Sequence, residues 1–116
     1  MICREGYKDG AALLQHTNEV QAVLLAIITN IGPDRVKIIC TGPAAELAKV
    51  RPHLESGLPI KFVTMDAGAM VLNAFPKACE DRHITILPRF EVPKEKLEEF
   101  KKGFQRFYQA TKVIIR

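Results

Sequence analysis

The chain has 116 residues, a net charge of +4 at pH 7 and a hydrophobic content of 47%. This length suits one compact domain, and the hydrophobic content excludes an intrinsically disordered protein. No uninterrupted apolar stretch reaches the roughly 18–20 residues of a membrane helix, so we expect no membrane span. The N-terminal residues show no basic head followed by an apolar region, so we expect no signal peptide and a cytoplasmic location.

The cysteines and histidines form no metal-binding or redox motif. Cys3, Cys40 and Cys79 are odd in number and contain no CxxC pair, which predicts free thiols in a reducing compartment. His53 and His83 stand at no ligand-like spacing, so we expect no metal and no other cofactor. The chain also lacks a nucleophile elbow, an HExxH motif and a Walker sequence, and whether it is an enzyme stays open.

The N-terminal part of the chain predicts a leader, a strand and a helix. Residues 1–10 are polar and aperiodic, and we expect a flexible leader or edge extension before a single domain of residues 11–116. The apolar run AALLQ, residues 11–15, has the length of a buried strand. Asn18 then serves as a helix N-cap, with Gln21 completing a capping box. Apolar residues recur at helical spacing as far as Ile31, where GPD ends the helix.

The middle of the chain predicts further strands that alternate with helices. RVKIICT, residues 35–41, is β-branched and mostly apolar, which predicts a central strand buried on both faces. GPAAELAKV then opens a helix. Residues 59–65 and 84–88 are the third and fourth predicted strands, and a short helix follows the third one.

The C-terminal part predicts an amphipathic helix and a fifth strand. The helix begins at Pro93 and carries one apolar face. Its members are Leu97, Phe100, Phe104, Phe107 and Tyr108. KVIIR, residues 112–116, is the last predicted strand. Because strands and helices alternate, we predict an α/β fold, a single-domain three-layer αβα arrangement with a mostly parallel five-stranded sheet of flavodoxin-like type.

The ends of the predicted strands define a candidate binding site. Ligands bind outside the carboxyl ends of the strands in an open α/β sheet. The residues expected on this rim are His16, Asn18, Cys40, Thr41, Gly42, Asp66, Gly68 and Arg89. Backbone N–H groups after Gly42 could hold a phosphate or carboxylate, Asp66 could act as a base, and Arg89 could clamp an anion.

Each of these residues also has a purely structural interpretation, and those alternatives stay open. Asp66 could be the N-cap of the next helix, and Gly42 could belong to an ordinary turn. Cys40, at the end of a buried strand, could be a small core residue. Cys79 lies near Lys77 and Arg82, whose charges would favour a reactive thiolate, or it could be an incidental exposed cysteine.

The layout of the chain from residue 11 onward resembles the DsrE-like family, small α/β proteins that include sulfur-relay subunits. The resemblance covers LLQHTNEVQAVLLAIITNI, DRVKIICTGPAAELA, LESGLPIKFVTMDAGAM, HITILP and KVIIR. It implies the family fold, a homo-oligomer and a sulfur-relay partner protein. Sulfur-carrying members have a cysteine just after the third strand, where this chain reads MDAG, residues 65–68. A sulfur role would therefore need the thiol of Cys79 or Cys40.

Three functions compete on these grounds. The first is a DsrE-like protein that handles sulfur, with Cys79 or Asp66 as catalytic residue, or that binds a small anionic ligand at the strand ends. The second is a non-catalytic homo-oligomeric module for binding or assembly. The third is a weak nucleic-acid binder that uses the basic C-terminal helix. Because Glu91, Glu95 and other acids interleave with its lysines and arginines, we do not expect nucleic acid as a partner.

Overall fold

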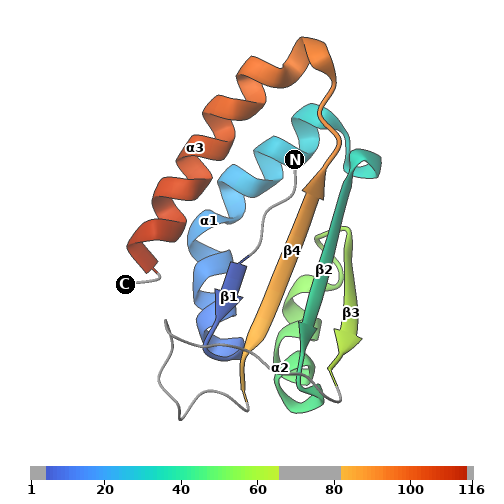
Figure 1. Ribbon diagram of the computed structural model, residues 1–116, viewed down its shortest axis with the longest axis vertical. Helices are drawn as coiled ribbons and strands as arrows, with labels where there is room; N and C mark the ends of the chain where they lie inside the picture. The colour runs from blue at the N-terminus through green and yellow to red at the C-terminus, as the bar shows by residue number, and fades with distance from the viewer. Residues whose placement is uncertain (1–4, 66–81, 115–116) are drawn as a thin grey trace.

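Four strands form one sheet in the order β1–β4–β2–β3 (Figure 1). The strands are β1 (Glu5–Tyr7), β2 (Val36–Gly42), β3 (Ile60–Thr64) and β4 (Ile84–Phe90). β1 and β2 both pair with β4 in antiparallel fashion, and β2 pairs with β3 in parallel fashion. The structure, a computed structural model, describes residues 5–65 and 82–114, with side chains as far as Phe107.

Three helices accompany the sheet. They are α1 (Gly10–Ile31), α2 (Ala44–Leu54) and α3 (Leu97–Ile114), and 3₁₀ turns cover Pro33–Arg35 and Lys94–Lys96. α1 begins where the carboxylate of Asp9 accepts a hydrogen bond from the N–H of Ala12 at 2.9 Å. It ends at Gly32, whose φ of 99° favours glycine and whose N–H donates to the carbonyl of Ile28.

The prediction of a three-layer fold with a mostly parallel five-stranded sheet is wrong. The described residues form a four-stranded sheet with one parallel pair. Residues 11–15, predicted as a strand, are the first turns of α1, because Asp9 rather than Asn18 caps that helix. Residues 112–114, predicted to begin the last strand, belong to the end of α3. The positions predicted for the strands at β2, β3 and β4 and for the helix at α2 are confirmed.

The described helices cover one and the same face of the sheet. Val36, Ile38 and Cys40 of β2 are buried, whereas Lys37 and Ile39 between them are exposed. The same alternation runs along β4. In Figure 1 the viewer looks at the uncovered face, with β2 in front of α2. The prediction that the second strand is buried on both faces is therefore wrong, and we call the uncovered surface the open face.

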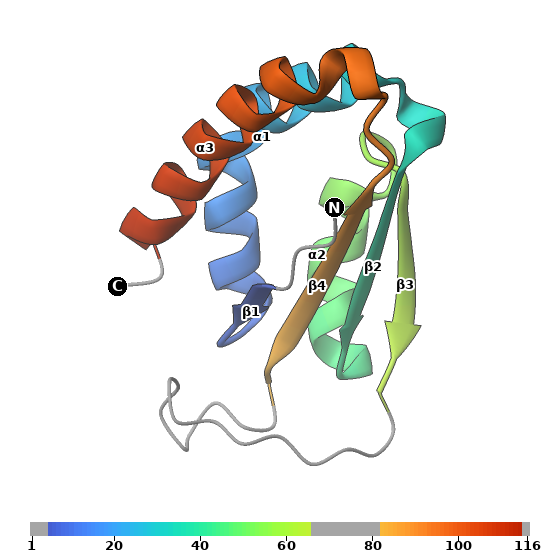
Figure 2. The same ribbon diagram turned by 45° about the horizontal axis from the view of Figure 1, so that its top comes forward.

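The core lies between the covered face and the helices. It is one cluster of buried apolar side chains from β1, β2, β4 and the three described helices, against which Ile60 and Phe62 of β3 pack partly buried. Phe90 of β4 meets Phe100 of α3 with ring centroids 5.3 Å apart, which fixes α3 against the sheet end. Gly103 of α3 lies where an added Cβ would stand 3.1 Å from Cγ1 of Ile27, so α1 and α3 approach closely there. Figure 2 shows the two helices running beside each other.

α1 is long and apolar enough to cross a membrane by length and composition alone. The sequence predicts a helix that begins only after Asn18, and the apolar stretch from there to Ile31 is too short to span a membrane. Core helices of soluble proteins share these properties. Here α1 buries Leu13, Val20 and Leu24 in the core cluster, so packing against the other described elements accounts for its apolar character.

Candidate functional site on the open face

The prediction that all the strand ends converge on one rim is wrong: β2 and β3 end at the same edge of the sheet, but β4 ends at the opposite edge. β4 runs antiparallel to β2, which places Arg89 opposite Lys37, four residues before Thr41 along β2. Thr41 and Arg89 share the open face but lie at its two ends. At a rise of roughly 3.3 Å per residue, Thr41 and Arg89 are about 13 Å apart along the strand direction.

His16 and Cys40 lie on the opposite, covered side of the sheet. Cys40 is fully buried in β2, and burial raises the pKa of its thiol to about 11. The thiolate form needed for sulfur transfer is therefore disfavoured at neutral pH at this position.

His16 belongs to a buried cluster of side chains beside α1. Its ring stacks on Tyr7 at 5.3 Å and meets the edge of Phe107 at 5.5 Å. Its Nε2 lies 3.6 Å from Oε2 of Glu5, which also accepts a hydrogen bond from the Tyr7 hydroxyl at 2.6 Å. Burial, and then the Glu5 carboxylate, raise the pKa of Tyr7, so its hydroxyl stays protonated and donates. Beside His16 the cavity holds about 30 Å³, room for about one water molecule.

The remaining predicted site residues are dispersed. Asn18 is exposed in the middle of α1 and caps nothing. Gly42 ends β2, where an added Cβ would stand 2.9 Å from Cγ1 of Ile84, so its role is close packing. Asp66, Gly68 and Cys79 lie outside the described residues.

The open face is organised as rows that run across the strands. One row contains Gly6, Thr85, Thr41 and Val63, which are register partners on neighbouring strands. The next contains Leu87, Ile39 and Lys61, and the last contains Arg89 and Lys37. The face therefore passes from small and hydroxyl-bearing side chains, through apolar ones, to cations.

A hollow of about 410 Å³ occupies the end of this face away from Lys37 and Arg89. It is lined by Gly6, Ile39, Thr41, His83, Thr85 and Leu87, and by Glu5, whose carboxylate accepts a hydrogen bond from the Tyr7 hydroxyl. A hollow of this size is within the range of small-molecule sites. A ring nitrogen of His83 lies 3.2 Å from the hydroxyl of Thr85, and burial lowers the pKa of His83, so the imidazole is neutral at pH 7. Hydroxyls and a neutral imidazole over an apolar floor suit an uncharged ligand body.

Three cations gather at the other end. Lys37 and Arg89 are directly opposite cross-strand partners, and Lys61 lies in the adjacent row. Among the described residues, none of the three takes part in an ion pair. Like charges directly opposite on a sheet are destabilising. The arrangement therefore creates a positive potential that an anion would relieve.

The site residues predicted from the sequence include Thr41 and Arg89 but not Lys37, Lys61 and His83. The signal was present in the period-2 alternation of VKIICT and ITILPRF, which indicates strands covered on one face only. Glu5 and Tyr7 belong to β1, a segment whose polar, aperiodic sequence predicts a leader outside the domain.

The described residues contain no group of three or more histidine, cysteine, aspartate or glutamate side chains placed to hold a metal ion. Comparisons of the chain with family models, with curated proteins and with solved structures give no match.

Proposed function

We propose that the protein binds a small amphipathic anion on the open face of its sheet. The observation that carries this proposal is the pairing of Lys37 with Arg89 directly across β2 and β4, with Lys61 in the next row. A carboxylate, phosphate or sulfonate at this end would neutralise charges that otherwise repel one another.

The neutral part of the ligand would extend over Ile39 and Leu87 into the hollow. From the cationic row to the row of Thr41 and Thr85 the distance is roughly 13 Å, which suits an organic acid with an apolar or aromatic body. The threonine hydroxyls and His83 would hydrogen-bond a polar group at the far end.

The uniform sign of the charges favours a ligand over a second copy of the chain on this face. Face-to-face packing would bring two sets of Lys37, Lys61 and Arg89 into a desolvated layer. Burying three unpaired cations from each copy without any acid opposite them is costly.

The test uses two fluorescent probes of nearly the same shape. 8-Anilinonaphthalene-1-sulfonate joins an aromatic body to an anion, and N-phenyl-1-naphthylamine presents a similar body without the charge. Wild-type protein is titrated with each probe beside the double variant Lys37→Gln/Arg89→Gln. The matched control is Lys101→Gln, which removes a cation from the exposed side of α3.

We expect the double variant to bind the sulfonate about tenfold more weakly, since loss of two charge contacts costs about 1.4 kcal/mol. Its affinity for the neutral probe and the affinities of Lys101→Gln should change less than about twofold. Equal losses for both probes, or sulfonate binding that is the same in all three proteins, would contradict the proposal. Tight, salt-dependent binding of a short RNA in place of the sulfonate would contradict it as well.

The sulfur-handling role implied by the DsrE-like resemblance stays a separate, untested prediction. The buried thiol of Cys40 offers it little support, and Cys79 lies outside the described residues. A cytoplasmic location is part of the present proposal, supported by the free thiol of Cys40.

A further inference from the structure

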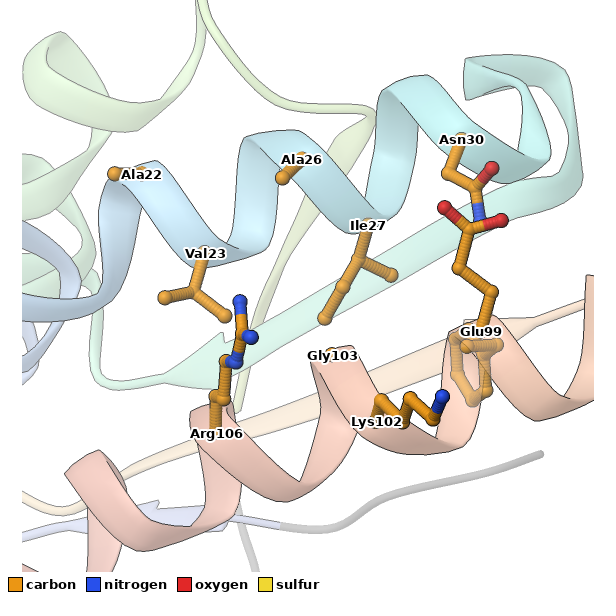
Figure 3. A pocket seen from close by; sticks show the side chains of 10 residues that line it. Ala22, Val23, Ala26, Ile27, Asn30, Glu99, Lys102, Gly103 and Arg106 are labelled. Carbon is orange, nitrogen blue, oxygen red and sulfur yellow. The ribbon is translucent and has the colours of Figure 1, made fainter.

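A groove of about 440 Å³ runs between α1 and α3, on the side of the helices away from the sheet core (Figure 3). Its floor is apolar and shallow at the centre, where Gly103 packs on Ile27. Ala22 and Ala26 of α1 are exposed along one wall. Small residues along such a groove allow another helix to approach closely.

Three charged residues line the groove: Glu99 and Arg106, which have opposite signs, at its two ends, and Lys102 between them. Figure 3 shows Arg106 extending from α3 toward Val23, and Glu99 beside Asn30 at the other end. Glu99 and Arg106 are exposed, and neither forms an ion pair with another described residue.

The spacing of these two charges is self-complementary. Seven residues are two helical turns, so Glu99 and Arg106 lie on one stripe of α3, about 10 Å apart along its axis. Their midpoint falls between Lys102 and Gly103. A two-fold axis through that midpoint, perpendicular to the helix, would place Glu99 of one copy opposite Arg106 of the other.

α1 supplies the apolar border of the same surface. Over its 22 residues it carries one acid, Glu19, and no lysine or arginine. On the groove side it presents Ala22, Val23, Ala26 and Ile27. By their residue counts α3 is about 27 Å long and α1 about 33 Å, lengths along which a second helix can pack.

From these observations we propose that the α1–α3 groove is the interface of a symmetric homodimer. Two copies of α3 pack antiparallel about Gly103, and two reciprocal Glu99–Arg106 ion pairs close the interface at its ends. This proposal concerns a different surface from the anion site on the sheet, and each can fail without the other.

Sedimentation equilibrium of the full chain at moderate salt tests the interface. Wild type is compared with Glu99→Arg, Arg106→Glu and the double variant that carries both changes. The matched controls on the same helix are Glu98→Arg and Lys101→Glu, at exposed positions that form their own i,i+3 pair outside the groove. Circular dichroism confirms that each variant is folded.

We expect a wild-type dimer and single reversals that each weaken dimerisation by about tenfold or more, because each replaces two attractions by two repulsions. The double reversal should restore most of the wild-type affinity, and neither control should change it. Lys102 lies next to the axis, where two copies approach, so Lys102→Gln should leave the dimer unchanged or tighten it. If the groove instead bound an acidic helix of another protein, Lys102→Gln would weaken the binding of that helix. The double reversal would then not restore dimerisation.

Two outcomes would overturn the proposal. One is a wild-type chain that remains monomeric at high micromolar concentration. This holds whether the chain is alone in solution or mixed with lipid vesicles into which α1 could insert. The other is a dimer whose affinity responds to the single reversals but is not restored when both are combined.

Discussion

Lys37 and Arg89 lie directly opposite each other on the antiparallel strands β2 and β4, on the face of the sheet that none of the described helices covers. Two cations in this relationship repel each other, and among the described residues neither forms an ion pair. A pair that costs stability in the isolated protein is typical of positions that serve binding.

Removing one of the two charges should stabilise the free protein. We expect Lys37→Thr to raise the free energy of unfolding at low salt by about 0.2–1 kcal/mol, because repulsion is lost and threonine favours strands. Urea denaturation at low and high salt measures this. The wild type should gain stability on addition of salt, and the variant should gain less. A variant that is less stable than wild type at low salt would show that the pair is not repulsive.

Glu46 should make the fold sensitive to acid. Its carboxylate accepts hydrogen bonds from Lys49 and from the N–H of Gly10, and thereby ties α2 to the start of α1. The contact with Lys49, followed by the bond from Gly10, lowers the pKa of Glu46. This stabilisation is complete above the ordinary pKa of about 4.5 and is lost as the pH falls through the folded-state value.

The variant Glu46→Gln should lose about 1.5–3 kcal/mol of stability at pH 7, and its stability should fall less steeply below pH 4.5. The control Glu55→Gln, at an exposed residue paired with Arg51, should change stability by less than about 0.5 kcal/mol. Urea denaturation over a pH series is the measurement. Equal effects of the two substitutions at pH 7 would refute the role assigned to Glu46.

His83 should add a second pH dependence, near neutrality. Burial lowers its pKa, so the unfolded chain takes up a proton at a pH where the folded chain does not. Stability should therefore fall as the pH drops below about 6.5, until the folded-state pKa is passed. His83→Gln should flatten the change between about pH 7.5 and 5.5, whereas His53→Gln, at an exposed position, should not. Parallel pH profiles for His83→Gln and wild type would count against this account.

Gly42 should resist substitution for reasons of space. An alanine Cβ there would stand 2.9 Å from Cγ1 of Ile84, a fully buried side chain that cannot move aside. We expect Gly42→Ala to cost about 1–3 kcal/mol in a thermal or urea unfolding experiment. Gly57→Ala is the matched control, since nothing lies within 4 Å of the added Cβ, and it should be neutral or slightly stabilising. A neutral Gly42→Ala would mean that β2 and β4 pack less closely than described.

Local sequence signals were sufficient for most elements and insufficient for their arrangement. β-branched runs located β2 and β3, and the aromatic spacing with Pro93 located the helix at α3. The direction of β4 is not encoded in its own residues, because a strand has the same propensities whichever way it runs. The stretch of 19 residues between β3 and β4, residues 65–83, is long enough for either direction, and a parallel β4 would place Arg89 at the opposite end of the sheet.

The wrong prediction for the start of α1 also changed the predicted fold. AALLQ is short and apolar, which is typical of a strand. However, Leu13, His16, Val20 and Leu24 form one buried stripe along α1 at helical spacing. The aspartate before Gly10 was a usable N-cap signal. With that strand removed, the alternation in VKIICT would have indicated a two-layer fold whose open face carries Lys37 and Thr41.

The central claim is that an amphipathic anion binds on the open face, and amide chemical-shift mapping of ¹⁵N-labelled protein with 8-anilinonaphthalene-1-sulfonate tests it most directly. The account predicts saturable shifts that concentrate at Lys37, Ile39, Lys61, Leu87 and Arg89, with α1 and α3 little changed. Shifts confined to the groove between α1 and α3, or absent from β2 and β4, would contradict it.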